Sequence, residues 1–314
     1  MRFWLVIGTT AALLLPAART YTQQPGLRMK TETLVQGPMR IDKVKDGLYV
    51  VRGPFLPCAP RGCTPNGTDD GLIHEAGDVA VRVTPEGVIL VDDKFPEHVA
   101  TVLDLVRTIT PLPIKYMLNS HHHGDHVSGN IRIAEQGINI VGHKNIRENF
   151  IKTRQPGPPN ITFADEAAVY LGTTEVKLHY FGRGHTNGDT VIEFPDLKTI
   201  HIGDLIIDGM PVIDYPNGGS AIEFVTTIDR VLTLDFDTMI PGHGRVMTKD
   251  DARAYRARFQ AMNDRGRALI KKGVSKDRFG AELKLDDFGW EKTVSTIVFV
   301  RGLGQYYDEL AGSR

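Results

Sequence analysis

The run Ser120-His121-His122-His123-Gly124-Asp125-His126-Val127 places four histidines and one carboxylate within a single short stretch. Imidazole nitrogens and carboxylate oxygens are the ligands that zinc takes from N and O donors. His121 and His123 are two residues apart, so in an extended segment their side chains point the same way. The glycine that follows permits a sharp turn, which directs Asp125 and His126 toward a different point. This loop therefore predicts ligands for two neighbouring metal ions, completed by side chains from elsewhere.

Three later loops offer further ligands, each beside glycine. His185 follows Gly184, and His243 lies between two glycines, where small neighbours leave room for a metal ion. Asp204 ends an apolar strand, where a buried carboxylate is costly unless it has a partner such as a cation. The complete predicted ligand set is His121, His123, Asp125, His126, His185, Asp204 and His243.

The other histidines and two further aspartates are not predicted to be metal ligands. His122 lies between two ligands and is expected to support its neighbours or to face outward. Asp92 and Asp189 either orient ligand imidazoles or have a plain role at a strand end or turn, and the two interpretations are equally well supported. Five histidines are predicted to be ordinary hydrogen-bonded residues: His74, His98, His143, His179 and His201.

The hydrophobic pattern alternates between strands and helices. Strands are predicted over residues 41–44, 48–51, 79–83, 87–92, 115–119, 138–141, 169–171, 176–180, 190–194, 199–203 and 237–240. Helices are predicted over residues 96–109, 127–136, 221–232, 250–271 and 294–310. The helix over 250–271 is rich in Arg and Lys, which indicates a solvated outer face. This alternation predicts an α/β fold, with two sheets packed together and helices outside.

A weak internal repeat indicates where the loops meet. A strand ending in Asp92 is followed by a helix, a strand and the loop at His121. A second series starts with a strand ending in Asp204 and continues through a helix and a strand to the loop at His243. Two such halves facing each other would place their loops along one edge, where sites form in α/β sheets.

Four motifs together resemble the metallo-β-lactamase-fold hydrolases. They are His-x-His-x-Asp-His at 121–126, Gly-His-Thr-x-Gly-Asp at 184–189, Gly-Asp at 203–204 and Gly-His-Gly at 242–244. The resemblance extends from about Val79 to Gly244. It implies an αβ/βα four-layer sandwich with a dinuclear zinc centre at one edge of the sheets.

The resemblance also implies a role for each ligand. One zinc ion would be held by His121, His123 and His185, and a second by Asp125, His126 and His243. Asp204 resembles the bridging carboxylate of the family.

Two departures separate the chain from the β-lactamases themselves. Class B1 and B2 enzymes have Cys at the position of Asp204, and B1 enzymes have a substrate-gripping Lys where Ile207 stands. The chain is therefore more similar to the glyoxalase II, lactonase and related branches.

The implied function is a zinc-dependent hydrolase with two Zn2+ per chain. A metal-bound hydroxide would attack a small carbonyl substrate, namely a lactam, lactone, ester or thioester. Asp125 would both ligate and orient the hydroxide, which makes it the predicted catalytic residue. Three loops, at 58–63, 156–160 and 208–215, are expected near the substrate, and the apolar residues in or beside them are Phe55, Met210, Ile213 and Tyr215.

Other functions are less well supported. An iron-dependent oxidoreductase, persulfide dioxygenase-like, is the main alternative on the same fold, but that branch has Glu in place of His123. A nuclease would carry extra basic modules, whereas the formal net charge is −1, so no nucleic-acid partner is expected. A non-catalytic binding protein would not need a complete ligand set. The expected partner is a small-molecule substrate, and no oligomeric state is predicted.

The N-terminus predicts export. A basic residue, an apolar run and small residues over 1–19 are typical of a signal peptide, followed by one hydrolase domain over 20–314. An uncleaved membrane anchor is the alternative, but the apolar run is short for a span of about 20 residues. The expected location is secreted or periplasmic, with no stable membrane span after removal of the signal. In that compartment Cys58 and Cys63 are predicted to form a disulfide, the alternative being half of a zinc site.

Overall fold

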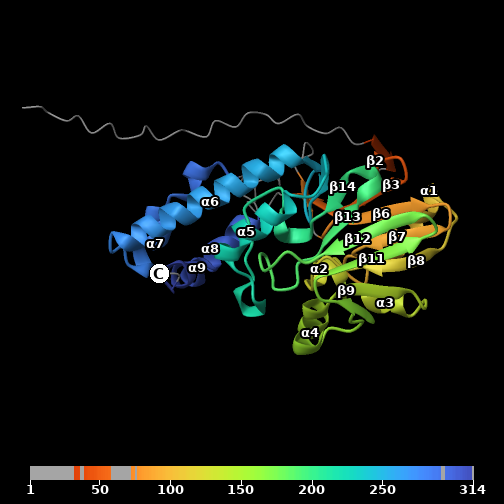
Figure 1. Ribbon diagram of the computed structural model, residues 1–314, viewed down its shortest axis with the longest axis horizontal. Helices are drawn as coiled ribbons and strands as arrows, with labels where there is room; N and C mark the ends of the chain where they lie inside the picture. Colours follow the sequence, from red (N-terminus) through yellow and green to blue (C-terminus); the bar gives the residue numbers. More distant parts are fainter. Residues whose placement is uncertain (1–31, 36–38, 58–71, 75, 291–293, 313–314) are drawn as a thin grey trace, which may run out of the picture.

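The computed structural model describes residues 32–35, 39–57, 72–74, 76–290 and 294–312. The predicted signal peptide over 1–19 and the predicted Cys58–Cys63 disulfide therefore lie outside the described residues. Two sheets form the centre of the molecule, and a group of helices extends from one side of them (Figure 1). Among the described residues, no helix combines the length and apolarity that crossing a bilayer requires.

The first sheet has eight strands, and its middle strands are buried on both faces. Along one of them, Val88 and Leu90 contact the core beneath a helix, whereas Ile89 and Val91 contact the core between the sheets, as the two-residue period of a strand requires. In spatial order the strands are β1 (Glu32–Val35), β2 (Arg40–Lys45), β3 (Leu48–Arg52), β6 (Val79–Thr84), β7 (Gly87–Val91), β8 (Ile114–Leu118), β9 (Asn139–His143) and β10 (Ile161–Phe163).

The second sheet has six strands and packs against the first. Its strands are β11 (Glu166–Leu171), β12 (Thr174–His179), β13 (Val191–Phe194), β14 (Thr199–His201), β15 (Thr238–Ile240) and β16 (Met247–Thr248). A separate pair consists of β4 (Phe55–Pro57) and β5 (Leu72–His74).

Short turns interrupt two of the predicted helices. The helix predicted over 127–136 breaks at residues 128 and 129, between a short helix that ends at Val127 and another over 130–134, and the last predicted helix breaks at Gly302. The α-helices are α1 (Val99–Ile109), α2 (Gly124–Val127), α3 (Asn130–Ala134), α4 (Lys144–Thr153), α5 (Ala221–Val231), α6 (Lys249–Lys271), α7 (Lys276–Leu283), α8 (Val294–Arg301) and α9 (Leu303–Gly312). Single 3-10 turns are η1 (Pro195–Leu197), η2 (Gly203–Leu205), η3 (Tyr215–Asn217) and η4 (Leu285–Phe288).

Three apolar cores define the layers. Helix α1 buries Val102 and Val106 against the outer face of the first sheet. Apolar side chains of both sheets interdigitate between them. Helices α5 to α9 form the third core with the outer face of the second sheet, through Val191 and Ile200. The order helix, sheet, sheet, helix confirms the predicted α/β sandwich.

Helix α6 differs from its prediction as a solvated outer face. Thr248 and Asp251 form a capping box at its start, which satisfies two backbone donors reciprocally. One side of the helix is then buried, with Tyr255, Phe259 and Met262 in the third core. The abundant Arg and Lys residues occupy only the opposite side, so charge content concealed an amphipathic helix.

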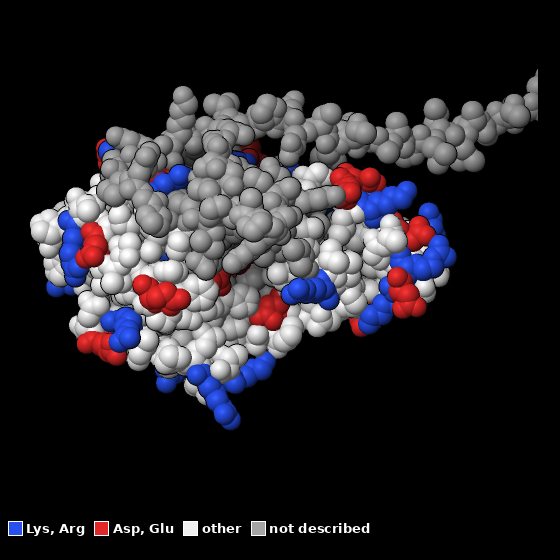
Figure 2. Space-filling view, turned by 180° about the vertical axis from the view of Figure 1, so that it is seen from behind, with Lys and Arg blue, Asp and Glu red and all other residues white. Residues whose placement is uncertain are grey.

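Charges of both signs are interspersed on the surface. On the face shown in Figure 2, the described Lys and Arg side chains lie among Asp and Glu side chains, and neither sign dominates. Several form ion pairs, such as Arg256 with Asp229 and Lys276 with Asp308.

Candidate metal centre

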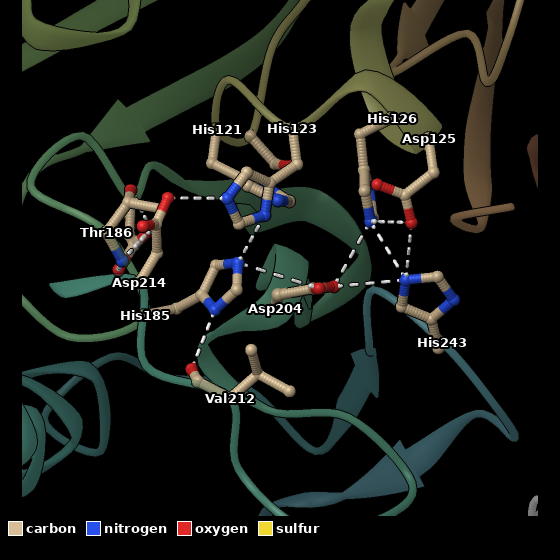
Figure 3. A network of polar contacts seen from close by, with 12 residues as sticks. His121, His123, Asp125, His126, His185, Thr186, Asp204, Val212, Asp214 and His243 are labelled. Atoms are coloured by element: carbon tan, nitrogen blue, oxygen red, sulfur yellow. Dashed lines mark hydrogen bonds and ion pairs between the residues drawn. The ribbon is translucent and has the colours of Figure 1, made fainter. Parts of the chain in front are cut away.

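The candidate site lies where strands of both sheets end. Strand β7 pairs parallel with β8, and β14 pairs parallel with β15, so the two strand–helix–strand series of the sequence form equivalent units. The loops that follow β8, β12, β14 and β15 carry the seven predicted ligands. Figure 3 shows these side chains pointing toward one another from loops far apart in the sequence.

The first group contains His121, His123, His185 and Asp204. Their ligand atoms lie within 4.8 Å of one another. Nε2 of His185 is 2.9 Å from Nδ1 of His123, and Oδ2 of Asp204 is 3.7 Å from Nε2 of His185. Three imidazoles and one carboxylate oxygen thus surround a single point.

The second group contains Asp125, His126 and His243, again with ligand atoms within 4.8 Å of one another. Nε2 of His126 lies 3.1 Å from Nε2 of His243, which lies 3.1 Å from Oδ2 of Asp125. Oδ1 of Asp204 is 3.2 Å from Nε2 of His126. Asp204 therefore directs one oxygen to each group, the position of a bridging carboxylate.

Hydrogen bonds outside the two groups fix which ring nitrogen faces inward. Nδ1 of His185 lies 2.7 Å from the carbonyl oxygen of Val212, and a carbonyl only accepts, so Nδ1 carries the proton. Nδ1 of His126 likewise donates to Oδ2 of Asp92 at 3.0 Å. In the neutral ring the other nitrogen then offers a lone pair. Both Nε2 atoms are therefore ready to bind a cation.

The hydroxyl group of Ser120 fixes the ring orientation of His121 in the same way. The hydroxyl of Ser120 donates to Oδ2 of Asp92 at 2.6 Å and so accepts from Nδ1 of His121 at 3.0 Å. Nε2 of His121 is buried and has no hydrogen-bond partner among the described residues. A buried acceptor left without a donor is costly, and a divalent metal ion would satisfy it.

The pKa shifts divide the histidines into two classes. Burial lowers the pKa of His121 well below its usual value and that of His185 to about 4, so both rings are neutral. Burial also disfavours charge on His126 and His243, but the carboxylates of Asp204 and Asp125 together outweigh it and raise both pKa values. Burial alone would raise the pKa of Asp204, yet these two imidazoles hold it well below its usual value. Without a cation, protons compensate the carboxylates, which fits a site built for positive charge.

Two glycines make room for the ligands. A Cβ at Gly77 would lie 2.2 Å from Cε1 of His126, and a Cβ at Gly242 would lie 1.9 Å from Oδ1 of Asp204. Both separations are far below van der Waals contact. Glycine is therefore needed at both positions for these side chains to occupy the centre.

Two alternatives left open by the sequence are resolved by hydrogen bonding. Asp92 supports the ligand His126 directly. Asp189 instead accepts from the backbone N–H and the hydroxyl of Thr186, at 3.0 and 2.5 Å, within its own turn. His122 is buried rather than outward-facing.

The histidines predicted to be ordinary hydrogen-bonded residues lie outside both groups where their side chains are described. His143 bonds the carbonyl of Ala164, and His201 bonds the carbonyl of Asp78. His179 contacts Glu193 at 2.8 Å. The side chain of His74 lies outside the described residues.

Asp214 is the polar contact that sequence reasoning missed. Its Oδ2 lies 2.8 Å from Nε2 of His123, the ring nitrogen opposite the one that faces His185. Asp214 lies ten residues beyond Asp204 in a loop without a recognised motif, so no local signal indicated it.

The predicted substrate-facing residues that the structure describes lie in or against the helical core. Met210 is 1% exposed and belongs to the helical core, and Ile213 and Tyr215 pack against that core. The side chain of Phe55 and the loop at 58–63 lie outside the described residues. The expectation for Met210 was wrong because its side chain is buried in this core and does not face an open site.

Comparison with known proteins gives one family. Residues 79–243 match the sequence model of the metallo-beta-lactamase superfamily, which is more than half of the chain. The hydroxyacylglutathione hydrolase of Methylococcus capsulatus is 27% identical over 51% of this chain and 57% of its own length. A metallo-beta-lactamase type 2 of a Bacillus species is 23% identical over 53% of this chain and 66% of its own. The chain thus spans less than two thirds of these curated relatives.

Solved structures show the same fold. A metallo-beta-lactamase from Pontibacter korlensis superposes with a TM-score of 0.59, covering 71% of this chain and 99% of the other, at 18% identity. One from Erythrobacter litoralis also gives 0.59, covering 73% and 100%, at 14% identity. At such low identity the likeness concerns the fold alone.

Proposed function

Because this chain belongs to the metallo-beta-lactamase superfamily, we propose that it is a metal-dependent hydrolase, which acts on a small carbonyl compound using two zinc ions. His121, His123 and His185 would hold one ion, and Asp125, His126 and His243 the other, with Asp204 between them. Zinc bound there would lower the pKa of a bound water to ~7 and polarise the substrate carbonyl.

The observation that carries the proposal is the orientation of the imidazoles. In His121, His126 and His185, the Nδ1 atom has a hydrogen-bond acceptor outside the centre, so the lone pair on Nε2 faces into the centre. Nitrogen and carboxylate oxygen donors in this number suit zinc. The buried, unpartnered Nε2 of His121 is the atom that most needs the ion.

Exposure indicates the side from which substrate approaches. The side chains of His126 and His185 are fully buried, whereas those of Asp125 and His123 are 28% and 27% exposed. Asp125 therefore lies on the open side of the centre. There its carboxylate can orient a water for attack and accept the proton that the water loses.

We expect the substrate to be a lactone, ester or thioester rather than a lactam. Ile207 stands where a substrate-gripping cation would be expected, and its side chain is buried. Arg245, two residues beyond His243, lies 3.3 Å from each of two carboxylates, those of Asp208 and Asp251. Its positive charge is thus already balanced. The hydrolase named among the relatives acts on hydroxyacylglutathione by its name, which supports thioesters as the first class to assay.

The test combines metal analysis with a substrate screen. Purified wild-type protein should contain about two zinc ions per chain and hydrolyse at least one of the four substrate classes. His121→Ala should lose metal and turnover, and His179→Ala, which removes an imidazole outside the site, should lose neither. Turnover that persists after complete removal of metal would contradict the proposal, and iron in place of zinc would favour the oxidoreductase alternative.

The predicted export of the chain is part of the same proposal. It is checked by fractionating cells that express the full-length chain and locating the mature protein.

A further inference from the structure

The contact between His123 and Asp214 extends the centre beyond its ligands. Nδ1 of His123 faces His185, so Nε2 carries the proton and donates it to Oδ2 of Asp214 at 2.8 Å (Figure 3). Nε2 of His122 lies 3.7 Å from the same oxygen. A carboxylate behind a ligand imidazole fixes its orientation and increases its basicity.

The loop that carries Asp214 is clamped against the backbone of another ligand. The N–H of Asp214 donates to the carbonyl oxygen of His185 at 2.8 Å, and the N–H of Gly219 donates to the carbonyl of Asp214 at 2.8 Å. The side-chain amide of Asn217 donates to Oδ2 of Asp214 at 2.7 Å. A Cβ at Gly219 would lie 2.4 Å from the His185 carbonyl oxygen. The position of Asp214 therefore depends on the whole loop.

The far end of this loop is held by the C-terminal helix α9. Glu309 accepts from the hydroxyl of Ser220 at 2.5 Å and from the N–H of Ala221 at 2.9 Å. Ser220 is buried, and it also caps helix α5. Tyr215 packs against the core that α9 helps to form. The chain of contacts thus runs from α9 through the 214–220 loop to His123.

Helix α9 lies outside residues 79–243, the part of the chain that matches the family. We propose that α9 is a support of the metal centre, with Glu309 and Asp214 as positioning residues that set the affinity for the ion at His123. The inference rests on the proposed function only in that His123 must be a metal ligand. Neither residue is a ligand in this proposal, and neither touches substrate.

A purely structural role for Glu309 predicts a different outcome. If Glu309 served only to start helix α5, its loss would lower thermal stability and leave both metal sites unchanged. If it positions Asp214, its loss weakens one metal site selectively. Affinity for each of the two ions separates the alternatives.

The experiment uses the full chain stripped of metal and reloaded with Zn2+ or Co2+. Dissociation constants are measured by competition with a chromophoric chelator, and Co2+ absorption reports the geometry of each site without an activity assay. Asp214→Asn should weaken one site by about 10–100-fold, the cost of removing the partner of a ligand histidine. Glu309→Gln should weaken the same site, by a smaller factor, and Glu309→Asp should lie between it and wild type.

Two controls match the variants. Asp308→Asn makes the same chemical change as Glu309→Gln one residue earlier on α9, where Asp308 pairs with Lys276 in solvent. Thr248→Ala removes the cap of another helix, α6, and should lower thermal stability without a change at either metal site.

Unchanged dissociation constants for both ions in Glu309→Gln, with a fall in melting temperature like that of Thr248→Ala, would overturn the inference. Equal constants for Asp214→Asn and wild type would overturn it as well. A wild-type protein that binds no metal would refute the proposed function itself, and that result is visible before any variant is compared.

Discussion

One added methyl group at Gly77 should disable half of the metal centre. A Cβ there would lie 2.2 Å from Cε1 of His126 and 2.3 Å from its Nδ1. Carbon atoms in contact are about 3.5 Å apart, so the ring must move by roughly 1.3 Å. Metal–ligand distances tolerate only about 0.2 Å, and the hydrogen bond from His126 to Asp92 would break in the same movement.

Gly77→Ala should therefore remove His126 as a ligand and leave the first group intact. Affinity for the second ion should fall by about 100-fold or more, and turnover by a similar factor, as a misplacement of about 1 Å in an active site does. The backbone of Gly77 is not in the left-handed region, so alanine adds no backbone strain. The remaining cost to folding is overpacking, about 1–3 kcal/mol.

Metal content after dialysis, chelator competition and the hydrolysis rate measure these effects together. Gly312→Ala is the matched control, because no atom lies within 4 Å of a Cβ at that position. Retention of both ions at wild-type affinity by Gly77→Ala would refute the reasoning, since it would mean that the imidazole of His126 need not stay where the structure places it.

Three further changes probe other parts of the centre and its surroundings. Gly242→Ala brings a Cβ to 1.9 Å from Oδ1 of Asp204, so it should lower the affinity for both ions rather than for one. Unequal losses of affinity, measured by chelator competition, would contradict this. Acidification from about pH 8 to about pH 6 should release metal, because Asp204 raises the pKa of His126 and His243 and their protons then compete with the cation; an affinity independent of pH would argue against these ligands. Asn263→Ala removes the acceptor of the buried Tyr306 hydroxyl on α9 and a donor to the Ala221 carbonyl on α5. The unpaired hydroxyl should cost about 1–3 kcal/mol, and thermal unfolding measures the loss.

The arrangement of the centre could be predicted because its signals are local. Spacing within the loop at 121–126 and glycine beside His185 and His243 are properties of short segments, and the two strand–helix–strand series indicated which strand ends would meet. The structure brings all seven side chains together in two groups joined by Asp204.

The supporting contacts could not be predicted, since they join segments with no shared pattern. Asp214 reaches His123 across 91 residues, and Glu309 reaches Ser220 across 89. Neither residue has neighbours that mark it as special. Only the packing of the 214–220 loop against α9 makes these contacts possible.

Two predictions were wrong, one because it relied on the charge content of a helix and one because it relied on the apolar character of a side chain. The many Arg and Lys residues of α6 concealed the buried side of Tyr255 and Phe259. Met210 was expected near substrate because it is an apolar residue of the loop at 208–215, yet its side chain packs in the third core. Burial of a single side chain depends on which element covers it, and that information is not in the segment itself.

Because the ligands are divided between the two sheets, the chain could be separated into two fragments that each carry part of the metal centre. Four of the seven come from the segment before β11, and three from the segment after it. Fragments separated between β10 and β11 would each carry an incomplete set, while the apolar surface between the sheets would still draw them together. When the two fragments are mixed with zinc, they should reassociate as a split enzyme does, and zinc binding should report the reassociation.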